Sequence, residues 1–180
     1  MKPRILILPG RFSSGPDHWQ TRWELEHPSF RRVSQRDWQT PDRAEWVATL
    51  QSAITESTAP AMLVAHSLAC SLVAHWAGAH RGPVSGALLV APSDVDAVDF
   101  PAGTTGFAPM PLLRLPFPSI AVTSTDDPYN SVARAAHYAS AWGSRLEIVG
   151  PLGHINSGSG LGSWPQGFAF LQHLMTGAGA

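Results

Sequence analysis

Three residues with catalytic side chains follow three apolar, strand-like runs of the sequence. Ser67 comes after MLVAH, Asp127 comes after IAVTSTD, and His154 comes after LEIVGPLG. A serine hydroxyl becomes an effective nucleophile when a base accepts its proton, and a histidine with a pKa near neutrality suits that task. A carboxylate can then fix the imidazole tautomer and stabilise the imidazolium. These residue types, in the order Ser, Asp, His, predict nucleophilic acyl chemistry.

The segment around Ser67 has the small residues that a sharp strand-to-helix turn requires. Such a turn lets a serine hydroxyl project over the end of a sheet, and its familiar pattern is G-x-S-x-G. Here the segment reads Ala65-His66-Ser67-Leu68-Ala69, with alanine at both glycine positions. A serine at this place also fits an ordinary helix N-cap. The order and spacing of Asp127 and His154 favour the nucleophile.

Short apolar runs alternate along the chain with helical patterns that would position these residues. Strands are expected at Arg4–Leu8, Phe30–Gln35, Met62–Ala65, Ala87–Ala91, Ile120–Ser124 and Leu146–Val149. Helices are expected at Asp17–His27, Pro41–Glu56, Leu68–His80, Ser131–Trp142 and Trp164–Met175. Thr40 is the expected cap of the second helix and Ser163 that of the last, and Trp19, Trp23 and Leu25 are expected on one side of the first. The alternation predicts a three-layer α/β/α sandwich with a mostly parallel central sheet.

The proline-rich segment Pro92–Pro118 interrupts this rhythm. A long irregular segment is usually functional or mobile, so it is a candidate wall of a pocket at the carboxyl ends of the strands. Its apolar residues are expected either to line that pocket or to pack. They are Phe100, Phe107, Met110, Leu112, Leu113 and Phe117.

Length and composition exclude several classes of protein. A chain of 180 residues predicts one domain spanning residues 1–180, and its 44% hydrophobic and 14% charged residues are typical of a globular chain. The formal net charge of -1, without a block of Lys or Arg, argues against a nucleic-acid partner. No H-E-x-x-H or C-x-x-C pattern indicates a metal. With Cys70 as the one cysteine, and a first apolar run that ends at Pro9, we expect a cytoplasmic protein without a membrane span.

Four stretches resemble the small α/β-hydrolase-fold serine hydrolases of the retinoblastoma-binding-protein type and their short bacterial relatives. They are LPGRFSSGPDHWQTRWE at 8–24, VAHSLAC at 64–70, TSTDDPY at 123–129 and GHINSGSGLGSWPQG at 153–167. The resemblance spans nearly the whole chain and implies a minimal α/β-hydrolase fold without a large lid. The retinoblastoma-binding motif L-x-C-x-E is absent, because LACSL at 68–72 ends in leucine. Binding of that protein is therefore not expected.

The resemblance implies a catalytic role for each reactive residue. It places the nucleophile on Ser67, the base on His154 and the acid on Asp127, the residue before a proline. Chemistry alone leaves the adjacent Asp126 as a rival acid.

The fold that the resemblance implies also has an oxyanion hole made of two backbone N–H groups. One N–H belongs to Leu68, the residue after the nucleophile. The other comes from the PGRF loop after the first strand, at Arg11 or Phe12.

The favoured function is hydrolysis of an ester or related acyl bond of a small molecule, without a cofactor. Two competing functions stay open. A protein of this fold can be a non-catalytic interaction module, since fold does not fix function. The same triad can also transfer the acyl group to an alcohol or amine. The sequence identifies neither the physiological substrate nor a protein partner.

Overall fold

Short runs of buried, mainly apolar residues build most of a central sheet of six strands in the computed structural model, which describes residues 3–177. The strands are β1 (Arg4–Leu8), β2 (Arg31–Arg32), β3 (Ala61–His66), β4 (Val84–Val90), β5 (Ser119–Ser124) and β6 (Arg145–Val149). They lie in the order β2-β1-β3-β4-β5-β6, and every neighbouring pair is parallel. All the carboxyl ends therefore meet at one edge of the sheet, as the sequence predicts.

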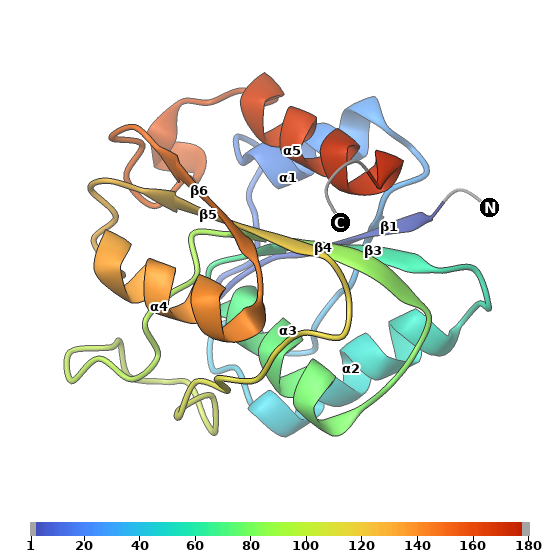
Figure 1. Ribbon diagram of the computed structural model, residues 1–180, viewed down its shortest axis with the longest axis horizontal. Coiled ribbons are helices and arrows are strands. Elements are labelled where there is room, and N and C mark those ends of the chain that lie inside the picture. The colour runs from blue at the N-terminus through green and yellow to red at the C-terminus, as the bar shows by residue number, and fades with distance from the viewer. Residues whose placement is uncertain (1–2, 178–180) are drawn as a thin grey trace.

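Helices cover both faces of this sheet (Figure 1). They are α1 (Trp19–Glu26), α2 (Arg43–Thr55), α3 (Leu68–Ala79), α4 (Val132–Trp142) and α5 (Pro165–Thr176). Helices α1 and α5 lie on one face, and α2, α3 and α4 lie on the other. The resulting three-layer α/β/α sandwich confirms the predicted fold class, and residues 3–177 form no large lid.

Successive side chains of a strand point to opposite faces of the sheet, so the core has two parts, one on each face. In β1, Leu6 and Leu8 pack with α2 and α3, whereas Ile5 and Ile7 pack with α1 and α5. Tryptophans fill both parts. Trp46, Trp76 and Trp142 are buried on the first face, and Trp19, Trp23 and Trp164 are buried on the second.

Two element predictions are wrong at the second strand and the helix after it. Strand β2 covers Arg31–Arg32 only, because it pairs with β1 at two positions of the sheet edge before the chain turns away. Helix α2 is capped by Asp42, whose carboxylate accepts a hydrogen bond from the Glu45 N–H. Thr40 instead donates its hydroxyl to Asp37.

Two further predictions fail in the first and last helices. Leu25 is 75% exposed, so α1 buries its tryptophans without it. Helix α5 begins at Pro165 after Trp164, which has a φ of 43° and makes no side-chain cap. Ser163 bonds to Glu26 rather than capping this helix.

The segment between β4 and β5 has no helix or strand within the described chain. Its residues Phe107, Met110 and Phe117 are buried in the core of the α2–α4 face, whereas Leu112 and Leu113 are exposed. Asp94 ties the segment to α4, because its carboxylate accepts hydrogen bonds from Arg134 and Tyr138. Within residues 3–177, no helix is long and apolar enough to cross a membrane.

Candidate active site

A sharp turn between β3 and α3 presents Ser67 at the carboxyl edge of the sheet. Its backbone has φ 60° and ψ -124°, a conformation that side chains rarely adopt and that tends to occur at functional sites. The Ser67 N–H donates to Val90 O at 2.9 Å, which holds the turn against β4. Ala65 and Ala69 are fully buried beside it. The β1 loop also lies close, because a Cβ on Gly10 would stand 2.8 Å from the Ser67 Cβ.

Three strand ends bring Ser67, His154 and Asp127 together. His154 Nε2 lies 2.8 Å from Ser67 Oγ, and His154 Nδ1 lies 2.9 Å and 3.0 Å from the two carboxylate oxygens of Asp127. The Asp127 side chain is 0% exposed. Since a carboxylate can only accept, Nδ1 carries the imidazole proton and Nε2 is free to accept the hydroxyl proton of Ser67. This connectivity is the one a serine nucleophile requires.

The adjacent carboxylate, Asp126, makes different contacts. It accepts hydrogen bonds from Ser124 Oγ at 2.7 Å and from the Gly153 N–H at 2.8 Å. These donors hold the pKa of Asp126 below its usual range, the Ser124 hydroxyl contributing most. Asp126 therefore links β5 to the loop that carries His154, while Asp127 contacts the ring itself.

Leu68 and the loop after β1, which carry the expected oxyanion donors, line the pocket together with Ser67. Leu68 is the first residue of α3, where helix geometry leaves N–H groups without intrahelical acceptors. In the β1 loop the Phe12 N–H donates to Trp38 O at 2.8 Å, so it is already used. The Arg11 N–H makes no hydrogen bond within the described residues. Of the two expected loop donors, Arg11 is thus the available one.

Two further residues contact the site directly, and sequence reasoning had not assigned Ser93 to it. Ser93, three residues after β4, has its hydroxyl 2.9 Å from Ser67 Oγ. Because the Ser67 proton is directed at His154, the Ser93 hydroxyl is the donor of this pair. His66 Nε2 lies 2.9 Å from His154 O, and since a carbonyl accepts, this nitrogen carries the proton. Its position just after a predicted strand, at the carboxyl edge of the sheet, could have identified Ser93 as a site residue.

Burial keeps the histidines behind the site neutral. Burial chiefly lowers the pKa of His66, helped by the neighbouring His18 and His154. Burial likewise lowers the pKa of His18 from 6.5 to about 3, helped by Arg32 and His154. The His18 and His66 rings meet nearly edge to face with centroids 4.7 Å apart, and the His66 and His154 centroids are 4.9 Å apart.

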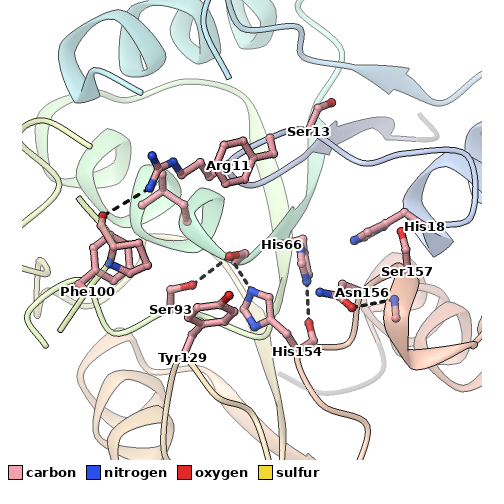
Figure 2. Close-up of a pocket in the computed structure, with 15 residues that line it drawn as sticks. Arg11, Ser13, His18, His66, Ser93, Phe100, Tyr129, His154, Asn156 and Ser157 are labelled. Atoms are coloured by element: carbon pink, nitrogen blue, oxygen red, sulfur yellow. Dashed lines mark hydrogen bonds between the residues drawn. The ribbon is translucent and has the colours of Figure 1, made fainter. Parts of the chain in front are cut away.

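A pocket of about 420 Å³ opens over Ser67 and His154. Figure 2 shows His18, Asn156 and Ser157 on one side of His154, and Arg11 and Phe100 on the opposite side. Tyr129 packs against the His154 ring, with centroids 4.7 Å apart. Within residues 3–177 no three His, Cys, Asp or Glu side chains gather as a metal ion would require.

A parallel α/β sandwich with a serine on a strained turn, beside a histidine and a carboxylate, is the architecture of an α/β-hydrolase. The chain matches the family model described as "Serine hydrolase" over residues 5–173. It belongs to that family, which confirms the resemblance found in the sequence and supports a hydrolase function.

Solved structures share the fold of this chain. A protein of Pectobacterium atrosepticum described as a YdeN-like hydrolase is 29% identical, with a TM-score of 0.86 over 97% of this chain and 91% of that one. The ydeN gene product of Bacillus subtilis is 17% identical, with a TM-score of 0.73 over 97% of this chain and 99% of that one. The carboxylesterase CesB of B. subtilis shares the fold at 13% identity, with a TM-score of 0.65 over 99% of this chain and 84% of that one. No curated protein sequence matches the chain significantly.

Proposed function

We propose that the protein hydrolyses an ester or related acyl bond of a small molecule through a catalytic triad of Ser67, His154 and Asp127. The observation that carries this proposal is the continuous chain of hydrogen bonds from Ser67 Oγ through the His154 ring to Asp127. Membership in the serine hydrolase family supports it.

In the first half of the reaction Ser67 Oγ attacks the substrate carbonyl while its proton moves to His154 Nε2. The imidazolium that forms is stabilised by Asp127, which is shielded from solvent and already bonded to Nδ1. The negative charge on the carbonyl oxygen is received by the N–H groups of Leu68 and Arg11. Each such donor is worth roughly 3–4 kcal/mol in the transition state.

In the second half His154 gives its proton to the leaving group, and the acyl chain stays on Ser67. His154 then accepts a proton from a water molecule that attacks the acyl-enzyme. It returns this proton to Ser67 Oγ as the bond between Oγ and the acyl carbon breaks, and the free carboxylic acid leaves. Ser93 keeps a hydroxyl donor on Ser67 Oγ, which holds that oxygen in line with His154.

A fluorophosphonate probe tests the proposal. We expect stoichiometric labelling of the native protein that is lost in Ser67→Ala and in His154→Ala, and a fall in ester turnover of roughly 10⁴–10⁶-fold in Ser67→Ala. Circular dichroism should show both variants folded. Folded wild-type protein that neither labels nor hydrolyses would contradict the proposal and favour a non-catalytic interaction module. Product analysis with a competing alcohol separates hydrolysis from acyl transfer.

A further inference from the structure

One side of the pocket is lined by polar groups that the proposed triad does not use. This polar arm consists of His18, His66, Asn156 and Ser157, and it lies across His154 from Arg11 and Phe100 (Figure 2). Among the described residues that line the pocket, Arg11 is the one permanent charge and no free carboxylate is present. The polar arm therefore has no group that would select a cation.

The orientation of the Asn156 side chain is fixed by the turn that follows His154. Asn156 Oδ1 accepts the Gly158 N–H at 2.9 Å, and only the oxygen of an amide can accept. The backbone N–H of Asn156 donates to Ser159 Oγ at 3.0 Å, and the Ser159 hydroxyl donates to Leu152 O. The amide nitrogen is consequently turned away from Gly158 and toward the interior of the pocket, as Figure 2 shows.

The side-chain amide nitrogen of Asn156, Nδ2, makes no hydrogen bond within residues 3–177, although Asn156 lines the pocket. The turn does not need this nitrogen, because an aspartate at the same position could accept the Gly158 N–H equally well. The geometry thus supplies two N–H bonds beside the reactive centre that serve no purpose in holding the protein fold.

His18 adds a second unused donor behind the same arm. Its Nδ1 accepts the Gln20 N–H at 3.2 Å as the cap of α1, so the proton of the neutral ring is on Nε2. His18 is 4% exposed, and its Nε2 has no partner among the described residues. Because no protein acceptor offsets this N–H dipole, it makes the potential at the base of the arm more positive.

We propose that the polar arm binds a hydrogen-bond-accepting oxygen of the substrate through the side-chain amide of Asn156. The preferred substrates are then acyl compounds that carry, apart from the scissile carbonyl, a second oxygen such as a ketone, ether or carboxylate oxygen. This inference rests on the proposed hydrolase function and narrows its substrate class. The opposite side, with Phe100 and Pro101, receives the remaining apolar part.

The test compares isosteric ester pairs that differ in one oxygen. One pair is p-nitrophenyl 4-oxopentanoate and 4-methylpentanoate, and the other is 2-methoxyethyl acetate and butyl acetate. For each pair, kcat/KM of the ester with the additional oxygen is divided by kcat/KM of its hydrocarbon counterpart. This ratio is measured for the wild type, Asn156→Asp and Asn156→Ala. Intrinsic reactivity cancels between proteins, since the substrates are the same. We expect one pair's ratio to fall roughly fivefold in both variants, the value of one neutral hydrogen bond.

A matched control separates the donor from the turn that holds it. Ser159→Ala removes two hydrogen bonds of the same turn and leaves the Asn156 amide in place, so its ratio should equal that of the wild type even if its rates are lower. A further p-nitrophenyl ester with a terminal carboxylate distinguishes an anionic from a neutral acceptor. If the acceptor is anionic, Asn156→Asp should impair its hydrolysis more than Asn156→Ala does.

Two results would overturn the proposal. One is a ratio that is the same in the wild type and both Asn156 variants for both pairs. The other is an equal change of that ratio in Ser159→Ala. Binding of the same pairs to Ser67→Ala, measured by calorimetry, must show the same preference and its loss in the double variant with Asn156→Asp. That readout does not require turnover, so it separates a failure here from a failure of the proposed hydrolysis.

Discussion

The buried histidine at the start of α1 makes the stability of the fold depend on pH in a way that one substitution can remove. In the folded protein, burial lowers the pKa of His18 from 6.5 to about 3, whereas an unfolded chain keeps the ordinary value. Between these two values the unfolded state binds one more proton than the folded state. The contribution of neutral His18 to the free energy of unfolding is therefore complete above pH 6.5 and decreases as the pH falls toward 3.

The size of this effect follows from the two pKa values. Between about pH 7.5 and about pH 5 the free energy of unfolding should fall by about 2 kcal/mol through His18 alone. Burial also lowers the pKa of His66, so the wild type should lose more than this in the same direction. Asp94 and Asp126 have pKa values below 3.8, so their contributions to stability are lost only in more acidic solution than this window covers.

The assay is urea unfolding of the wild type and His18→Asn across this pH window. Asparagine can still accept the Gln20 N–H, because its Oδ1 takes the place of Nδ1, but it does not titrate. The variant should be less stable at every pH, yet its free energy of unfolding should fall about 2 kcal/mol less between about pH 7.5 and about pH 5. Parallel curves for the two proteins would refute the reasoning.

Three other changes test the site. Gly10→Ala places a Cβ 2.8 Å from the Ser67 Cβ, and the resulting displacement should lower kcat roughly 10²-fold with the fold retained by circular dichroism; an unchanged kcat would contradict the close approach. Asp127→Asn should lower kcat about 10⁴-fold. Asp126→Asn, which removes no contact to the histidine ring, should lower kcat less than about tenfold, and the opposite ranking of the two kcat values would assign the acid to Asp126. Cys70 is fully buried and burial raises its pKa, so iodoacetamide should label it in urea but not in the native state, as mass spectrometry can show.

The sequence predicted the parts of this fold that depend on local pattern. Apolar runs located five strands closely, and four of them are buried parallel strands, which need continuous apolar residues whatever their neighbours are; the edge strand β6 is only partly buried. Strand β2 was overextended because its length depends on pairing with β1, which the local residues Phe30–Gln35 do not encode. The cap at Asp42 was missed for a related reason, since nearby polar residues such as Thr40 were equally suitable by type, whereas the start of α5 has no side-chain cap for a residue type to indicate.

The site could be predicted where residue type and strand ends coincide. Ser67, Asp127 and His154 each follow a strand, and the structure brings all three together. The contacts of Ser93 and His66 depend on side chains meeting across separate strand ends, which no spacing along the chain reveals.

The long segment between β4 and β5 carries Phe100 to the pocket, while Asp94 holds it against α4. The reactive side chains come instead from the ends of β3, β5 and β6 and from the loops that follow them. The stretch around Phe100 that shapes this wall can therefore vary without moving the strands that carry the serine and its histidine, provided that Ser93 and the buried Phe107 are kept. Within this architecture, the shape of the pocket can change through that stretch while the geometry of Ser67 and His154 stays the same.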